Sequence, residues 1–435
     1  MPEPAVSSAP PGAAAEARRG LVDFLAGLGI LLLFGLSGYA LEYLGIPYLS
    51  AGGSIVTKLH PATYVFALAL LIAVIANPDP LGYAASLASR RLGSIALIAA
   101  CAIIYVFMSR HKPGMVASFL FDAMVSAAVV GLVLADSPGP ARQRLARLLH
   151  GIVIANALLA IVEVATHWRL FPFGAAGEYF TWDYRATALF GHPLDGALAT
   201  GVYVVILMTT PHVAGLAQRL RLPVILLCLA AMPAIGARTS FVIVYAVAGA
   251  VVVLRVLSFL RGRTQASHMA MLAALAATAL LPLLAAGAYQ LGYLDGFLGR
   301  FEDDSGSAGT RLSLYNLFSH YRLAEMLTGY SLVELRTRIR IEGLESGVEN
   351  AWVGHLLQFG IPLSVMLWCA LAAFLADTVR AAGRHAILPI VFMLLVVSTS
   401  VGISGKTNML VMPTILVLVL LGRSDAGGDG RTARF

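Results

Sequence analysis

Arginine and glutamate side chains that could bind anions and move protons stand at intervals from Arg185 onward. Arg185 opens an apolar stretch, Arg238 stands in a short turn between two such stretches, and Arg311 lies in a long polar segment. A guanidinium stays charged and binds oxyanions through paired hydrogen bonds. Glu349 directly precedes another apolar stretch, and a carboxylate there can accept a proton from a hydroxyl. These residue types permit anion binding and general-base chemistry.

A second dense group of polar residues lies between Arg185 and Asp195. His192 and Asp195 are three residues apart, so they share a face if the segment is helical. Pro193 between them is expected to kink or end that helix and to free carbonyl groups nearby. A His–Asp pair alone fits a structural role as well as a catalytic one, and its closeness to Arg185 favours the functional interpretation.

One long polar segment, Arg300–Pro362, interrupts a chain that is otherwise apolar nearly throughout. Long loops are usually functional or disordered, and the aromatic residues of this one favour a folded lid that forms part of an active site. Around Arg338 three arginines alternate with Thr and Ile, which predicts one basic side of an extended segment. That side could hold an anionic polymer or lipid head groups, or it could be a solvated face over a membrane.

The overall composition is that of a polytopic membrane protein. Of the 435 residues, 59% are hydrophobic and 12% are charged, about half the charged share of a soluble domain. The net charge of +7 comes from basic residues scattered between apolar runs. Membrane topology explains this distribution, which does not form a nucleic-acid-binding surface. Cys101, Cys228 and Cys369 lie in apolar runs and imply neither a disulfide framework nor a metal site.

Twelve apolar runs predict an all-α fold of about 12 transmembrane helices. The runs lie near 21–44, 61–77, 93–108, 115–136, 148–167, 186–211, 222–237, 239–258, 268–290, 350–377, 386–402 and 408–422. The expected regions are a disordered tail at 1–20, helices 1–9 at 21–290, one large outer loop at 291–349, helices 10–12 at 350–422, and a second tail at 423–435.

Basic residues in the connections between the apolar runs predict that both chain termini lie on the cytoplasmic side of the membrane. Arginine-rich connections alternate with connections that hold few cations, as the positive-inside rule requires. The loop at 291–349 then faces outward. On this topology a set of polar residues falls in the outward halves of the helices, namely Glu42, Asp122, Glu163, His167, His192, Asp195 and Arg238. They predict a hydrated cavity open to the outside, unless each is separately paired or reaches the interface.

Three patches, in this order, resemble the O-antigen ligase and O-antigen polymerase superfamily. The patches are Arg185 with Gly191-His192-Pro193, then Gly236-Ala237-Arg238-Thr239-Ser240, then a large loop with Gly309-Thr310-Arg311 that ends in Glu349-Asn350 before Leu356 and Gly360. The resemblance covers roughly residues 180–375 and is strongest to exopolysaccharide polymerases of the secreted-matrix type.

The resemblance implies a polymerase that joins undecaprenyl-diphosphate-linked oligosaccharide repeats at the periplasmic face of the bacterial inner membrane. Arg238 and Arg311 would bind the diphosphate with help from Arg185, and Glu349 would deprotonate the acceptor hydroxyl, so that displacement inverts the anomeric centre. The expected substrate-binding residues are Arg185, His192, Asp195, Asn350, His355 and Arg338. The partners implied are the lipid-linked glycan, the bilayer and other polysaccharide assembly and export proteins.

One departure from the family pattern bears on the reaction. Ligases of the family carry His where this chain has Glu349, which questions ligase activity and leaves glycosyl transfer open. His355 is a second candidate base, on a different face of a helix. The alternatives are ligase-type transfer to another acceptor, or a transporter of polysaccharide or lipid-linked sugar. A transporter would need a comparable polar path to the inside, where few intramembrane charges lie.

We expect neither a metal nor another cofactor. The first outside loop, Gly45–His60, holds no acidic residue, whereas metal-dependent lipid-linked glycosyltransferases carry an acidic pair there. Arginines would neutralise the leaving diphosphate instead. The adjacent pair Asp303–Asp304 is interpreted as part of a solvated turn.

Overall fold

The computed structural model describes most of the chain and confirms the all-α class. The described residues are 13–50, 54–112, 118–134, 137–175, 178–179, 183–262, 286–287, 289–290, 292–302, 313–319, 321–344 and 348–422. Within these ranges the fold is helical apart from one antiparallel ladder of two-residue strands, β1 (Gly174–Ala175) and β2 (Glu178–Tyr179), in which Gly174 pairs with Tyr179.

Most of the long helices overlap predicted apolar runs, but the helices at 80–90, 295–302, 323–328 and 332–341 do not. The helices of the first half are α1 (Ala13–Gly35), α2 (Gly38–Tyr43), η1 (Ile55–Lys58), α3 (Pro61–Ile75), α4 (Pro80–Arg90), α5 (Leu92–His111), η2 (Leu120–Val125), α6 (Ser126–Leu134) and α7 (Gly139–Thr166). Those of the second half are α8 (Pro193–Thr209), α9 (Gln218–Ile235), α10 (Arg238–Leu260), α12 (Asp295–Glu302), α14 (Leu323–Thr328), α15 (Leu332–Ile341), α16 (Ala351–Ala382), η3 (Arg384–Ala386), α17 (Ile387–Val397), η4 (Gly402–Ser404) and α18 (Val411–Leu421). The predicted run at 268–290 lies almost entirely outside the described residues.

Several of these helices have the length and composition of membrane spans. Among the described residues α5, α7, α9, α10 and α16 are long and apolar enough to cross a membrane. Shorter apolar helices lie at Pro61–Ile75, Leu120–Leu134, Pro193–Thr209, Arg384–Val397 and Val411–Leu421. Many large apolar side chains on α5 and α10 are exposed, as lipid-facing surfaces require. The protein is therefore a membrane protein.

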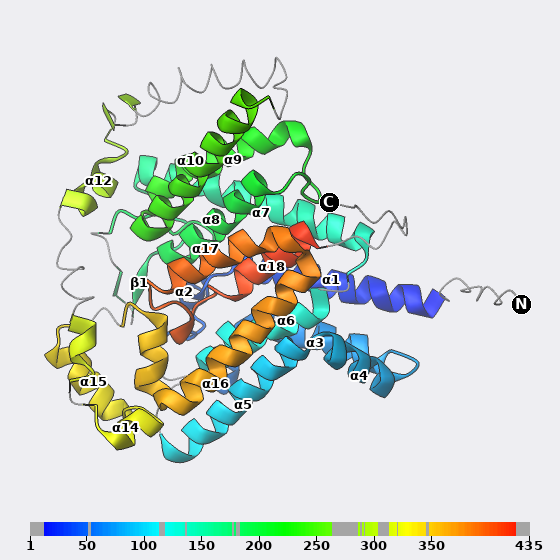
Figure 1. Cartoon of the computed structure of the whole chain (residues 1–435), viewed down its shortest axis with the longest axis vertical. Coiled ribbons are helices and arrows are strands. Elements are labelled where there is room, and N and C mark those ends of the chain that lie inside the picture. Colours follow the sequence, from blue (N-terminus) through cyan, green and yellow to red (C-terminus); the bar gives the residue numbers. More distant parts are fainter. Residues whose placement is uncertain are drawn as a thin grey trace, which may run out of the picture.

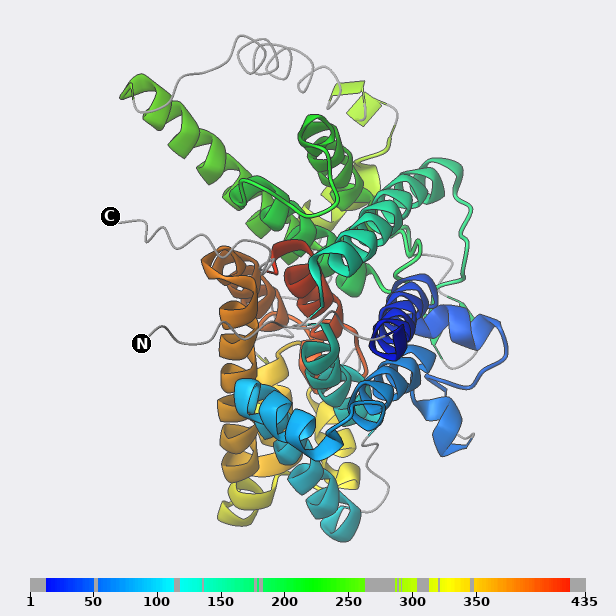
Figure 2. The ribbon, with the colours of Figure 1, turned by 90° about the vertical axis from the view of Figure 1, so that its right-hand side faces the viewer.

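Two apolar helices form the centre of the molecule. Every residue of α18 is buried, and α8 is buried along nearly its whole length. A helix that is apolar on all sides is stable only when other helices surround it. Helices α9, α10, α17 and α18 pack around α8, while α16 runs along α5 and α1 along α3. Figures 1 and 2 both show α16 lying beside α5 over much of its length.

The two ends of the helix bundle differ. In Figure 1, α12, α14 and α15 lie at the left end of the long helices together with β1, and α4 lies at the right end. The short helices of the predicted outer loop thus gather at one end. We call this the loop end of the molecule. The opposite end carries α4.

Three predicted boundaries are corrected. Helix α1 begins at Ala13, inside the segment expected to be a disordered tail, and its run is interrupted after Gly35. The run predicted at 186–211 is helical only from Pro193 to Thr209. Pro193 therefore starts α8, because proline suits the first helical position, where no N–H partner is needed. His192 and Asp195 consequently do not share one helical face, since His192 is the cap that precedes the helix.

Helix α16 is broken at Gly360. This residue has φ 75° and ψ 176°, so Ala351–Phe359 forms a separate short piece. Such a break leaves carbonyl groups without helical partners. Three consecutive carbonyls find donors elsewhere: Leu356 O accepts from the Tyr321 hydroxyl at 2.6 Å, Leu357 O from Tyr330 N at 2.8 Å, and Gln358 O from Lys112 Nζ at 2.6 Å.

The loop-end helices pack on this short piece of α16. A small apolar cluster joins them, made of Leu314, Leu317, Tyr330, Leu335, Leu344, Val353 and Leu357. The extended segment predicted around Arg338 is wrong, because these residues form helix α15, whose N-cap Ser331 accepts a hydrogen bond from Glu334 N. On a helix Arg336 and Arg340 are exposed, while Arg338 turns toward Tyr330.

Candidate functional site

Arg185 is held in place at the loop end by an acidic and an aromatic neighbour. Its Nε and Nη2 donate to both oxygens of Asp183, and its guanidinium lies 5.6 Å from the Phe173 ring centre. Burial works against ionisation of Asp183, but the hydrogen bonds and charge of Arg185 outweigh it and hold the pKa of that carboxyl below its ordinary value. Nη1 of Arg185 makes no hydrogen bond to any described residue, so it remains available to a ligand.

The turn that carries Arg238 lies against Arg185. Ala186 N donates to Ala234 O at 2.9 Å, which runs the two segments side by side. Gly236 has φ 72°, and a Cβ on it would lie 2.6 Å from Arg185 Cγ. Only glycine permits both the conformation and the close approach. Arg238 is the half-buried first residue of α10, so the structure brings two of the predicted arginines to one place, at the positive end of a helix.

His192 caps α8 and stacks on a tyrosine that the sequence analysis did not select. Its Nδ1 accepts from Leu194 N at 3.1 Å. The imidazole lies 5.9 Å from the Tyr39 ring at an interplanar angle of 23°, and 5.7 Å from the Phe173 ring. One ring nitrogen is therefore used in helix capping, which gives His192 a structural task beside any contact with a substrate.

Asp195 is a buried carboxyl with one oxygen unsatisfied. Asn408 N donates to Oδ2 at 3.4 Å, while Oδ1 has no hydrogen-bond partner among the described residues. Only 7% of the residue is exposed. Tyr39 lies near enough to both this carboxyl and Arg185 for their charges to act on its hydroxyl. Arg185, Tyr39, His192 and Asp195 thus form one cluster, which we call the arginine–aspartate cluster.

The segment 398–408 joins this cluster to the start of α16. Asn408 contacts Asp195, Ser404 O accepts from the Gln358 amide, and Ile403 O lies 3.3 Å from His355 Nε2. Lys406 Nζ donates to the carbonyls of Tyr48 and Lys58, each at 2.7 Å, and lies 3.4 Å from the Tyr48 ring centre. Burial lowers the pKa of Lys406 to about 8. This lysine adds a second cation near the cluster.

The other carboxylates that were predicted to lie in the outward halves of the helices organise loops. Asp122 accepts from the Tyr48 hydroxyl, the His60 backbone and the Thr63 hydroxyl. Glu163 accepts from the backbone nitrogens of Leu170, Thr187 and Ala188, and Glu42 accepts from those of Leu49 and Ser50. Each of these three carboxylates therefore has its own hydrogen-bond donors, and a shared hydrated cavity is not needed to explain them.

The predicted site residues at the start of α16 differ in how well a substrate could reach them. Asn350 is the N-cap, since its Oδ1 accepts from Trp352 N at 3.0 Å and Val353 N at 3.1 Å. Glu349 is half-buried and stands just outside that cap. His355 is fully buried, with Nδ1 accepting from the Trp368 indole at 3.2 Å and Nε2 facing Ile403 O. Glu349 is therefore better placed than His355 to meet a substrate.

The remaining predicted residues lie apart from the cluster or outside the described chain. Arg338 pairs with Glu334 at 3.2 Å and lies 5.0 Å from the Tyr330 ring centre, within the loop-end helices. Arg311 lies outside the described residues. Over the described part of the chain, no three His, Cys, Asp or Glu side chains are grouped so as to hold a metal ion.

Sequence reasoning missed Tyr39, Asp183 and Asn408. The Asp183-x-Arg185 spacing and the polar stretch Ser404–Asn408 between two apolar runs were the available signals. No family model, curated protein or solved structure matches this chain. Function must therefore be inferred from the residues and their geometry.

Proposed function

We propose that the protein is a polysaccharide polymerase that transfers a glycan from undecaprenyl diphosphate to an acceptor hydroxyl at the periplasmic face of the bacterial inner membrane. The observation that carries the proposal is the placement of Arg185 against the Arg238 turn. Two arginines whose backbone segments lie side by side suit the two phosphates of a lipid diphosphate.

Arg185 and the residues around it have separate tasks in this proposal. Asp183 and Phe173 fix the Arg185 guanidinium, so little entropy is lost when Nη1 donates a hydrogen bond to a phosphate oxygen. Arg238 adds charge at the N-terminus of α10, which favours anions. Stabilising the developing charge of the leaving diphosphate is the main catalytic requirement of such a transfer. Arg311 would complete the set.

The unsatisfied oxygen of Asp195 suits a sugar hydroxyl. A buried carboxylate oxygen without a donor is costly unless a ligand supplies one. Glu349 would remove the proton of the attacking hydroxyl, and the direct displacement would invert the anomeric centre. In this reaction the bond from the anomeric carbon to the phosphate oxygen breaks, a bond to the acceptor oxygen forms, and Glu349 takes the proton.

The proposed topology has twelve spans, with both termini in the cytoplasm and the loop at 291–349 in the periplasm. The gathering of α12, α14 and α15 at one end and α4 at the other supports it (Figure 1). Arg90 is the last residue of α4 and Arg91 its C-cap, as the positive-inside rule expects of a cytoplasmic end.

A transporter of lipid-linked sugar is the second candidate, favoured by the break in α16. Transporters place broken helices at their substrate sites, and Ala351–Phe359 is such a half-helix. The two candidates differ in product: a polymerase lengthens the glycan in a sealed vesicle or in detergent, whereas a transporter moves it without lengthening.

The test is reconstitution of the purified full chain with an undecaprenyl-diphosphate oligosaccharide, with product length read on a gel. We expect longer glycans from the wild type and a loss of about 10²-fold or more in Arg185→Ala, because the residue stabilises developing charge. Arg219→Ala is the matched control, since Arg219 is exposed at the start of α9. Failure of the wild type to lengthen the glycan, with movement of the lipid-linked sugar across the bilayer, would replace this proposal by the transporter.

A further inference from the structure

An open groove lies between α1 and α7, away from the arginine–aspartate cluster. Its volume is about 570 Å³, and it is lined by Gly20, Asp23, Phe24, Gly27, Leu28, Leu31, Ala141, Arg144, Leu145 and Leu148. These residues recur every three or four positions, so each helix contributes one face. The groove is therefore built along two neighbouring helices.

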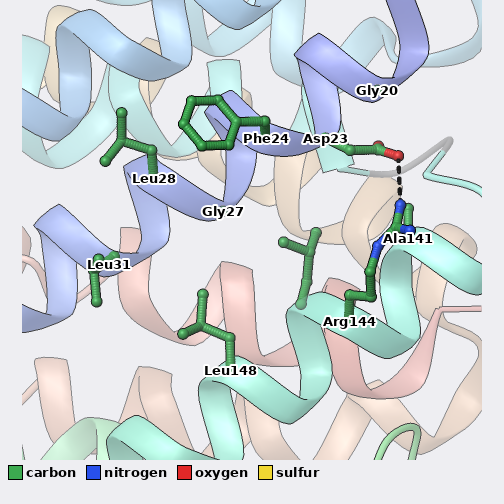
Figure 3. Close-up of a pocket in the computed structure, with 10 residues that line it drawn as sticks. Gly20, Asp23, Phe24, Gly27, Leu28, Leu31, Ala141, Arg144 and Leu148 are labelled. Carbon is green, nitrogen blue, oxygen red and sulfur yellow. Dashed lines mark hydrogen bonds and ion pairs between the residues drawn. The ribbon is translucent and has the colours of Figure 1, made fainter. Parts of the chain in front are cut away.

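Most of the groove is apolar and faces outward from the bundle. Figure 3 shows Phe24, Leu28 and Leu31 of α1 and Leu148 of α7 along its length. Phe24 is 65% exposed and Leu31 is 49% exposed, which suits contact with lipid in a membrane protein. Gly20 has open space in place of a side chain, and a Cβ on Gly27 would touch only Leu145, at 3.5 Å. These two glycines leave space for a ligand at the bottom of the groove.

One end of the groove is charged, with an excess of cations. Asp23 and Arg144 meet there in a single contact of 3.5 Å, and the Arg144 side chain is 64% exposed (Figure 3). Arg19 is close enough to act on Asp23, and the exposed Arg147 follows one turn along α7. Asp23 contacts Arg144, Glu16 lies one turn before Arg19 on α1, and the Arg144 guanidinium has further N–H groups to offer.

We propose that this groove binds one anionic phospholipid, with its phosphate on Arg144 and an acyl chain over Phe24, Leu28, Leu31 and Leu148. The apolar length and the cationic end match the two parts of such a lipid. On the proposed topology the charged end lies at the cytoplasmic leaflet, where cationic side chains attract anionic head groups. The bound lipid would fill the space between α1 and α7 and stabilise their packing.

The test uses the purified full chain in detergent and native mass spectrometry, with added phosphatidylglycerol or phosphatidylcholine. We expect the wild type to retain one phosphatidylglycerol in preference to phosphatidylcholine. Arg144→Gln removes one near-surface cation and should weaken phosphatidylglycerol binding about fivefold. Because Arg144 is largely exposed, this variant keeps the fold. Phosphatidylcholine binding should weaken less in it, because the choline group offsets the charge of the phosphate.

Gly27→Leu places a side chain in the groove and should remove the retained lipid whatever its head group. Gly249→Leu is the matched control, because Gly249 is a helical glycine of α10 with nothing within 4 Å. Equal phosphatidylglycerol retention by the wild type, Arg144→Gln and Gly27→Leu would overturn the proposal. A dimer that Gly27→Leu dissolves would also overturn it, since the occupant would then be a second copy of the chain.

Discussion

Gly329 and Gly360 face each other so closely that neither position has room for a side chain. A Cβ on Gly329 would lie 2.6 Å from the carbonyl group of Gln358, and one on Gly360 would lie 2.6 Å from that of Leu327. Both have positive φ, at 74° and 75°. This paired approach lets the segment before Tyr330 dock on the break in α16, next to the hydrogen bonds that satisfy the exposed carbonyls.

Gly360→Ala should therefore destabilise the protein through both conformation and collision. Gly360 has φ 75° and ψ 176°, a region that essentially only glycine occupies, so alanine there costs about 1–3 kcal/mol, and the Leu327 backbone must also move. Gly343→Ala is the control, because Gly343 has φ 66° and nothing within 4 Å. In detergent we expect the melting temperature to fall in the order wild type, Gly343→Ala, Gly360→Ala. Equal melting temperatures of the two variants would mean that the two backbones are not in contact.

Arg185→Lys keeps the charge and loses the planar group that Asp183 holds. Hydrogen bonds to charged groups contribute about 1.5–3 kcal/mol each, so lysine should weaken binding of a lipid diphosphate by about tenfold or more. Asp183→Asn retains one acceptor oxygen and should weaken it less. Titration calorimetry with undecaprenyl diphosphate measures both. Unchanged affinity in Arg185→Lys would remove this guanidinium from the phosphate site.

Asn350→Ala and Glu349→Gln should change different quantities. Asn350 is the helix cap, so its loss should lower stability, whereas the loss of Glu349 should lower the reaction rate. The cap substitution is expected to cost about 1 kcal/mol of stability, seen as a lower melting temperature. The substitution of Glu349 should lower the rate of chain lengthening by about 10²-fold or more, since general-base assistance contributes about 10²–10⁴-fold. Near-normal lengthening by Glu349→Gln would exclude the base role.

Lys112 links stability to pH through the carbonyls of Tyr330 and Gln358, to which its ammonium donates. Burial lowers the pKa of Lys112 to about 8, from 10.5 in the unfolded chain. Between these values the unfolded chain binds more protons, so the free energy of unfolding rises with pH. The Lys112→Met variant should melt at a lower temperature at pH 7 and show a smaller rise from pH 8 to 10. The exposed neighbour Arg110 provides the control as Arg110→Met, and an unaltered pH profile in Lys112→Met would refute the assignment.

Reporter fusions test the proposed topology. Alkaline phosphatase fused after Gly343, at the end of α15, should be active, because it would lie in the periplasm. The same reporter fused after Arg219, at the start of α9, should be inactive, and a cytoplasmic reporter should give the opposite pattern. Activity of the same reporter at both positions would contradict the twelve-span arrangement.

Composition and the lengths of apolar runs were enough to predict a helical membrane protein and nearly every described apolar helix. The length of an apolar run reflects the cost of exposing polar backbone to lipid, which depends on local sequence alone. The same reasoning selected Arg185 and Arg238, because polar residues among apolar runs are costly and so stand out. The two-residue alternation of arginines around Arg338 was wrongly predicted to be extended, because this segment is helix α15.

Only the tertiary structure decided which of these residues meet. Tyr39 from α2, Asp183 and Arg185 before α8, the Gly236 turn and Asn408 come together although they are far apart in the chain. Their contacts depend on how the helices pack around α8 and α18, and a pattern within one segment does not encode that packing. The break of α16 was equally hidden, since glycine and proline are common in membrane helices. The positive φ of Gly360 becomes stable only when Tyr321, Tyr330 and Lys112 supply donors to its freed carbonyls.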